Sequence, residues 1–333
     1  MSELDMMKLW KGLFFCFWHS DKTPVQTELA ERLAGLLQQM RPAMAQLYWA
    51  GLLATLRREW FAMDHHRLDK FLMLVRKFVA ALLARLADTQ WDAAAITSLT
   101  TQLPLQQQLI PASSSKSLGL SYHLADVWLQ ELKQLPSQQQ QALSQQALLL
   151  LLEPFVAVLE AAGEQPLLGR IKEAVFDVLV CDITAAAAGG DVDEEQSLAY
   201  CAGRDAAQLA ALLFERGASE GVRARNRQVL YSISNELERA AGKRRKLAAA
   251  AADAAEQQQQ QQQQYEPDQE QQQDAPSTKK KKKKKKQVQQ EQPLQEVQPQ
   301  QEQLLPQQEQ LQPQPTAGDG CQWRNAKEQQ EAE

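Results

Sequence analysis

The sequence predicts an all-α, helical-repeat-like domain, an irregular α-solenoid or bundle, followed by a disordered low-complexity tail. Up to Leu237, apolar residues recur at the i, i+3, i+4 and i+7 positions of amphipathic helices. No stretch alternates apolar and polar residues as a half-buried strand does. From Leu247 onward, alanine, glutamine, lysine and proline replace the apolar pattern. We therefore expect the helical domain at 1–245 and the disordered tail at 246–333.

The first two helices are expected on either side of a short turn. Large aromatic residues recur every four positions within 5–18, which favours a core-facing helix. In the turn, Thr23 is expected as the N-cap and Pro24 as the first helical residue. Pro42 should end or kink the second helix. The first stripe consists of Trp10, Phe14 and Trp18, and the second of Leu29, Leu33, Leu36, Leu37 and Met40.

Residues 49–78 are predicted to form two helices joined by a tight, charged corner. Asp64 can cap the second helix, because its carboxylate can accept amide protons that a first turn leaves unpaired. We expect the corner charges to form an ion-pair network with Asp64, so that losing Arg67 or Asp69 loosens the hairpin. These charges are Arg57, Arg58, Glu59, Arg67, Asp69 and Lys70. The expected core residues of the hairpin are Trp49, Trp60, Leu68 and Phe71.

Further amphipathic helices complete the domain. Pro154 is expected to kink or break one of them, and Pro166 to open the next. A loop at 110–117 and an exposed Ala/Gly-rich acidic insertion at 185–197 are expected from composition. The helical stretches are 82–86, 96–103, 121–135 with Pro136 closing it, 142–159, 166–179, 208–214 and 227–237.

Composition limits the classes of function. The chain has 36 basic and 41 acidic residues, of which 10 and 14 lie in 248–333, so the helical part has almost no net charge. This argues against a wholly basic nucleic-acid-binding domain. Four cysteines without a CxxC pair favour reduced, buried thiols in an intracellular protein. We expect no signal peptide and no membrane partner, because the apolar runs are too short or are interrupted.

The search for catalytic groupings favours a protein that is not an enzyme. The sequence has neither a glycine-rich phosphate loop nor a GxSxG motif. His65, His66 and Asp69 are the most suggestive cluster for a metal, but adjacent side chains on a helix point about 100° apart. A solvated corner is therefore favoured over a metal site. We expect no cofactor and no small-molecule substrate.

Basic residues form islands in the last third of the chain. Arg223, Arg225 and Arg227 form the first, for which solvated charge and a functional contact are equally open. The other two, KRRK and a run of eight lysines, are expected to act as a nuclear-import signal or as an RNA-phosphate contact. They are Lys243, Arg244, Arg245, Lys246, Lys279, Lys280, Lys281, Lys282, Lys283, Lys284, Lys285 and Lys286.

Five segments in order resemble the nucleolar ribosomal RNA processing protein 1 family over residues 8–240. They are WKGLFFCFWHSDK (10–22), REWFAMDHHRLDKFLMLVRKF (58–78), LGLSYHLADVWLQEL (118–132), LLEPFVAVL (151–159) and FDVLV (176–180). The matching positions, expected to define the fold and a docking surface, include Trp10, Gly12, Trp18, Asp21, Arg58, Glu59, Trp60, Asp64, Arg67, Asp69, Lys70 and Arg76.

The resemblance implies a non-enzymatic scaffold in the nucleus and nucleolus that is needed for pre-rRNA processing. Its implied partners are precursor ribosomal particles, chiefly of the large subunit, and their assembly factors. Pre-rRNA contacted through the basic islands and an import receptor are further expected partners. The alternative is a nuclear helical-repeat adaptor that acts on transcription or chromatin through its glutamine-rich tail.

Overall fold

The computed structural model describes residues 1–100, 118–188 and 198–264. Every regular element in these three ranges is helical, which confirms the all-α prediction. In order they are α1 (Glu3–Trp18), α2 (Thr23–Gln39), α3 (Pro42–Glu59), the short 3-10 helix η1 (Trp60–Ala62), α4 (His65–Asp88), α5 (Ala93–Thr100), α7 (Gly119–Lys133), α8 (Ser137–Ala142), α9 (Gln145–Ala161), α10 (Gln165–Ile171), the π-helical segment η2 (Lys172–Asp177), α11 (Val178–Ala188), α12 (Ala206–Ala218) and α13 (Ala224–Gln264).

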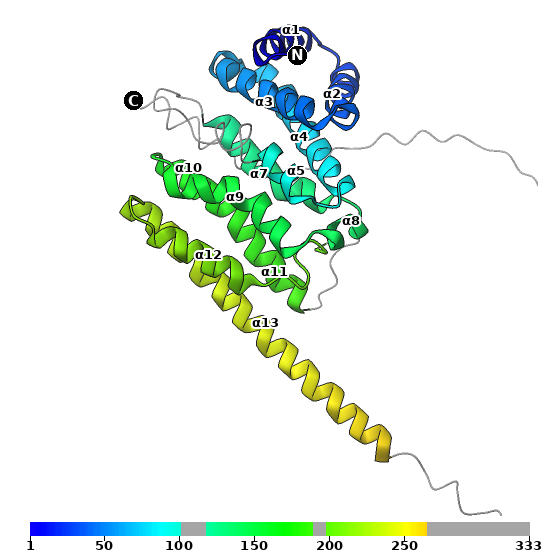
Figure 1. Ribbon diagram of the computed structural model, residues 1–333, viewed down its shortest axis with the longest axis vertical. Helices are drawn as coiled ribbons and strands as arrows, with labels where there is room; N and C mark the ends of the chain where they lie inside the picture. Colours follow the sequence, from blue (N-terminus) through cyan, green and yellow to red (C-terminus); the bar gives the residue numbers. More distant parts are fainter. Residues whose placement is uncertain (101–117, 189–197, 265–333) are drawn as a thin grey trace, which may run out of the picture. The chain divides into compact units, whose positions relative to one another are not determined.

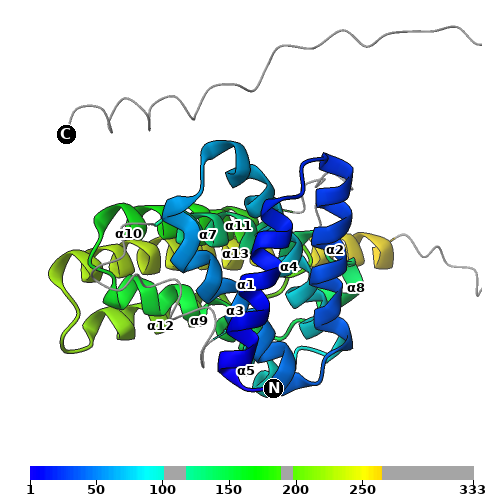
Figure 2. The same cartoon turned by 90° about the horizontal axis from the view of Figure 1, so that it is seen from above.

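The helices stack in layers, as expected for a helical-repeat-like domain (Figures 1 and 2). α1 packs on α3, α2 on α4, α4 on α7 and α5 on α9, and the layer of α12 and α13 contacts α9. Buried apolar side chains from successive layers form one core that reaches from Met6 to Ala241. Each helix buries one stripe against its neighbours, which is the packing that stabilises solenoids.

α13 crosses the expected end of the helical domain. The sequence places this end at residue 245, but the helix continues to Gln264. Alanine has the highest helix propensity, and a helix already nucleated by packing is extended at little cost. The Ala-rich segment after Leu247 can therefore continue α13 without a core of its own. The disorder predicted for 265–333 concerns residues outside the described ranges.

The N-terminal layer differs from the prediction in detail. Phe17 is buried while Trp18 is half-buried, and Leu36 is 37% exposed, so the two apolar stripes are rotated from those expected. Lys22, and not Thr23, occupies the N-cap of α2. Pro42 lies in the first turn of α3, after α2 has already ended. Proline suits this position because its missing amide proton would have no helical partner there.

The second half of the domain differs from the prediction in three places. α9 does not break at Pro154, because its ring is buried in the core and packing offsets the lost backbone hydrogen bond, and the predicted kink there stays a prediction. The short helix α8, which follows Pro136, was not predicted, since its sequence SQQQQA has no apolar stripe. The predicted insertion begins within α11, which continues to Ala188. The loop at 110–117, residues 101–103 and the rest of the insertion, 189–197, lie outside the described ranges.

The three cysteines in the described ranges differ in their exposure. Cys201 is buried, as expected, but Cys16 and Cys181 are exposed, so the prediction of buried thiols was wrong for these two. Each lies on the exposed side of a helix whose opposite side is packed, with Phe17 and Ile183 among the buried residues. None of the described helices combines the length and the apolar character needed to cross a membrane.

Candidate interaction surfaces

Lys70 joins the beginning of α4 to the end of α1. Its ammonium group donates hydrogen bonds to the carbonyl oxygens of Trp18, at 2.7 Å, and Ser20, at 2.8 Å. The residue is only 7% exposed. Desolvation lowers the pKa of Lys70, and the charge of Arg67 adds to this, against the opposing effect of Asp21. A cation here satisfies carbonyl groups that a helix C-terminus leaves unpaired and complements the helix dipole.

Asp64 and Arg67 complete this joint. A carboxylate oxygen of Asp64 accepts a hydrogen bond from the backbone amide of Arg67 at 3.1 Å, so Asp64 caps α4 as predicted. The Arg67 guanidinium also forms an ion pair with Asp64. Its central carbon lies 4.6 Å from the centre of the Trp18 ring, in cation–π geometry. Residues from both ends of the joint therefore hold α1 against α4.

The charges of the corner do not form the single network that was predicted. Arg58 pairs with its neighbour Glu59 at 2.7 Å. Arg57 turns toward α7 and donates to the Ser121 hydroxyl at 2.9 Å. Asp69 is exposed, and no residue of the described ranges forms an ion pair with it. Successive helical positions point in different directions, so this sequence cluster is divided among several faces.

Aromatic packing fixes the position of α1 on the hairpin. The Trp10 indole is buried and donates to the carbonyl oxygen of Tyr48 at 2.7 Å. The rings of Phe14 and Phe71 stack with their centres 4.8 Å apart. α1 approaches α3 so closely that a Cβ atom at Gly51 would lie 2.5 Å from the Trp10 ring. These aromatic residues belong to the core, so they position α1 and do not themselves form a surface for a partner.

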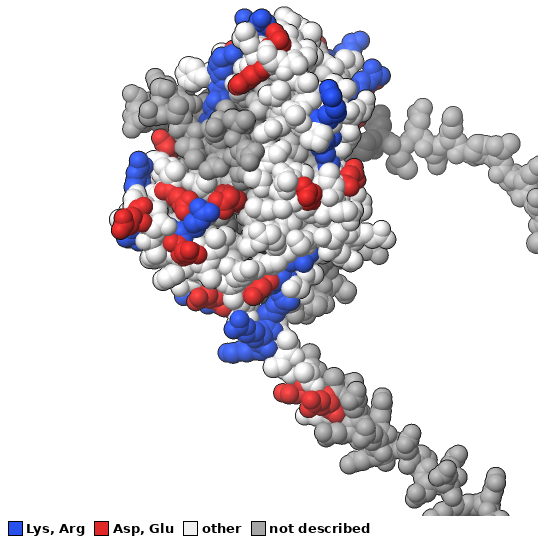
Figure 3. Space-filling view, in the orientation of Figure 1, with Lys and Arg blue, Asp and Glu red and all other residues white. Residues whose placement is uncertain are grey.

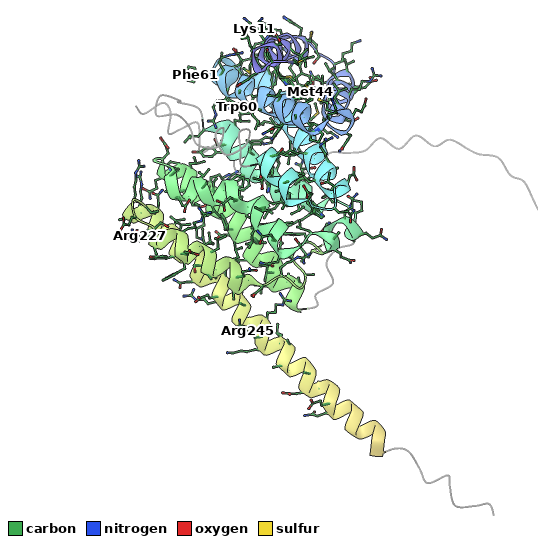
Figure 4. The ribbon with its side chains drawn as sticks, viewed as in Figure 1. Lys11, Met44, Trp60, Phe61, Arg227 and Arg245 are labelled. Carbon is green, nitrogen blue, oxygen red and sulfur yellow. The ribbon has the colours of Figure 1, made fainter. Side chains whose placement is uncertain are left out.

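The corner is also tied to α7. Trp60 is 8% exposed and packs on Gly119, where an added Cβ atom would lie 2.5 Å from the indole nitrogen. Arg76 forms an ion pair with the nearly buried Glu131 of α7. Phe61, the residue after Trp60, is 78% exposed instead (Figure 4). Most of the expected docking positions thus have contacts within the fold, which leaves few of them for a partner.

A second apolar face of α1 was missed by the sequence analysis. Leu9 is 40% exposed and Phe15 is 45% exposed, and the helix position between them is Gly12. An added Cβ atom at Gly12 would meet nothing within 4 Å, so the fold itself does not require glycine there. The signal was present, because α1 is apolar on more than one side. We call Leu9, Gly12 and Phe15 the α1 outer face.

The first basic island has contacts within the fold. Arg225 donates to the carbonyl oxygen of Gly163, and the Arg227 side chain donates to that of Gly217 at 2.8 Å. Both carbonyls lie at or just beyond the C-terminal ends of helices, where arginine is a favoured hydrogen-bond donor. Arg223 is exposed. Arg227 is half-buried and has a contact within the fold, whereas Arg223 and Arg225 are exposed, so both interpretations stay open for these two.

The KRRK cluster lies on α13 where this helix extends past α12 (Figure 3). Arg244 donates a hydrogen bond to the carbonyl oxygen of Arg204. Lys243, Arg245 and Lys246 are exposed, and Arg245 extends away from the helix (Figure 4). The eight-lysine run lies outside the described ranges.

The histidines of the corner do not gather metal ligands. The rings of His65 and His66 lie against each other, with their centres 3.7 Å apart. Within the described residues, no group of three or more His, Cys, Asp or Glu side chains is arranged to hold a metal ion.

Comparisons with known proteins agree with the resemblance of the motifs. A family model described as the nucleolar protein Nop52 matches residues 1–304. The ribosomal RNA processing protein 1 homolog of Drosophila melanogaster is 37% identical over 133 residues, 39% of this chain and 19% of the fly protein. Homolog B of Mus musculus is 31% identical over 59% of this chain and 26% of its own length. The Caenorhabditis elegans homolog is 26% identical over 72% of this chain and 59% of its own length.

Proposed function

Because this chain belongs to the Nop52 family of nucleolar proteins, we propose that it is a non-enzymatic scaffold of precursor ribosomal particles in the nucleolus. In this role it supports pre-rRNA processing, chiefly for the large subunit. The observation that carries the proposal is the family match over 1–304, which includes the entire packed unit. The names of the relatives support the assignment to rRNA processing. Stacked helices present extended surfaces of the kind that solenoids use to bind partners.

The proposed docking site for an assembly factor is the α1 outer face. Its occupant is a helix of the partner protein, because Gly12 leaves room for a second backbone to approach closely between Leu9 and Phe15. Exposed Lys11 lies beside this face on α1 (Figure 4), and it favours an acidic residue on the partner. Among the other expected docking positions, Asp21, Arg58 and Asp69 are also exposed.

Localisation and sedimentation of the tagged full-length chain test the proposed function. The protein should concentrate in nucleoli and co-sediment with precursors of the large subunit. Its depletion should cause precursor rRNA to accumulate, and re-expression should reverse this. A diffuse nucleoplasmic signal with unchanged precursor rRNA would contradict the proposal and favour the adaptor for transcription or chromatin.

Substitution of Gly12 by leucine should separate docking from folding. Leucine has the higher helix propensity, by up to about 1 kcal/mol, and the space around Gly12 is open, so the variant should be at least as stable as the parent. Its side chain would block a partner helix, and co-sedimentation with precursor particles should fall several-fold. Gly35→Leu on α2 is the matched control, because a Cβ atom there also meets nothing within 4 Å. Equal co-sedimentation of the two variants would exclude the α1 outer face as the docking site.

A further inference from the structure

Three exposed cations form a row on α13. Arg239, Lys243 and Lys246 are exposed, and no side chain of the described ranges forms an ion pair or hydrogen bond with them. Their i, i+4 and i+7 spacing places them on one face of the helix, within about 10 Å along its axis. We call these three residues the basic stripe. Only two of them belong to KRRK, so the stripe is not visible as a contiguous motif.

The folded helix divides the KRRK cluster into parts with different surroundings. Arg244 faces the packed helices and donates to the Arg204 carbonyl. Arg245 lies seven residues after Glu238, which places the two on the same face of α13. Lys243 and Lys246 remain with Arg239 on the basic stripe. A receptor that reads the four residues as an extended peptide would have to unwind α13 here and break the contact of Arg244.

The chemistry of the stripe suits a row of phosphates. Lysine and exposed arginine meet phosphate oxygens as positive charges and carry no base specificity. Between Tyr231 and the end of α13 there is no aromatic residue. Proteins that bind single strands generally use aromatic side chains as stacking platforms for bases, and this part of the helix has none. Duplex RNA, in contrast, is recognised mainly by its shape and by contacts to phosphates and 2′-hydroxyls.

We infer that the basic stripe binds the phosphate backbone of double-stranded RNA. The inference rests on the proposed function, because RNA is the nucleic acid of the particles to which the scaffold is assigned. It names a contact that the α1 outer face does not provide. Protein docking would occur in the N-terminal layer and RNA binding on the last helix.

Fluorescence anisotropy with the full-length chain tests this inference. The probe is a labelled RNA duplex of about 16 base pairs, which is the length that a typical duplex-binding domain covers. The stripe variant combines Arg239→Gln, Lys243→Gln and Lys246→Gln. Between about 50 and 200 mM salt, its binding constant should be lower than that of the parent by about tenfold or more. The slope of log K against log salt is negative, and its magnitude should decrease by about 3. The loss of each phosphate contact decreases the magnitude of the slope by about 1.

The matched control removes the same charge elsewhere. Lys22, Arg41 and Arg223 are also exposed, and no ion pair within the described ranges involves them. Changing all three to glutamine should leave the slope unchanged. The measurements are repeated in a chain whose lysines 279–286 are glutamines, so that this run cannot mask the effect. Circular dichroism should show the same helix content in all variants.

Single substitutions separate RNA binding from nuclear import. Arg239→Gln lies outside KRRK. It should decrease the magnitude of the slope of log K against log salt by about 1 without affecting import. Arg245→Gln lies inside KRRK and should not change the slope. An unchanged slope in the stripe variant, an equal loss in the matched control, or a defect confined to import would overturn the inference. Equal binding of single-stranded RNA or duplex DNA would overturn the assignment to duplex RNA. These binding assays can fail while nucleolar localisation and rRNA processing still support the proposed function.

Discussion

Replacement of Trp10 by alanine is expected to lower the free energy of unfolding by about 3–5 kcal/mol. The indole is 1% exposed, and its ring centre lies 4.7 Å from that of Tyr48 and 5.6 Å from that of Phe78. Alanine would leave a cavity between α1 and the hairpin, because the close approach at Gly51 is shaped around this ring. It would also leave the Tyr48 carbonyl without its buried donor. Urea unfolding followed by circular dichroism measures the change.

Hydrogen exchange can show which helices the Trp10→Ala substitution destabilises. In a stack of helices, each layer depends mainly on its immediate neighbours. Hydrogen exchange should therefore increase in α1, α2 and α3, while the pair of α12 and α13 stays protected. Phe15→Ala is the control, because this neighbouring aromatic residue is 45% exposed on the same helix. If Phe15→Ala destabilises the protein as much as Trp10→Ala, the assignment of the two faces of α1 is wrong.

The sequence predicted the helices well because most of them bury one stripe. Trp49, Trp60 and Phe71 are in the core as expected, since helical spacing alone determines which side they share. α8 was missed because its contribution is polar: buried Gln140 donates to the carbonyl oxygens of Lys133 and Leu135. A hydrogen bond that depends on tertiary packing leaves no periodic pattern in the sequence. Leu68, the fourth residue expected in the core of the hairpin, is only half-buried, because it lies at the edge of its stripe.

The candidate surfaces were harder to predict, because a charged side chain is available to a partner only when it has no contact within the fold. A contiguous cluster such as KRRK is conspicuous in a sequence, but helical geometry separates its members and adds Arg239 from one turn earlier. The hairpin corner shows the same effect. Its charges were grouped by proximity in the chain, whereas Arg57 contacts α7 and Lys70 contacts the end of α1. Only the packed structure shows which cations remain for a partner.

Lys70→Met is expected to lower the free energy of unfolding by about 2–3 kcal/mol, since hydrogen bonds to a charged group are worth more than neutral ones. Methionine keeps the buried stem of the side chain, so the change removes mainly the ammonium group, its bond to Trp18 at the end of α1 and its bond to Ser20 in the following turn. The carbonyl groups of Trp18 and Ser20 would lose this donor at a helix end. Urea unfolding measures the loss, and hydrogen exchange should localise it to the end of α1.

The adjacent Asp69 provides the control for this prediction and tests the original network hypothesis. Asp69→Ala removes an exposed carboxylate that has no ion-pair partner in the described ranges, so stability should change by less than about 0.5 kcal/mol. A common ion-pair network would instead make both substitutions costly. Because Lys70 holds the helix that carries the α1 outer face, Lys70→Met should also weaken co-sedimentation with precursor particles. Gly12→Leu should do so without loss of stability, which distinguishes a residue that positions the docking helix from one that touches the partner.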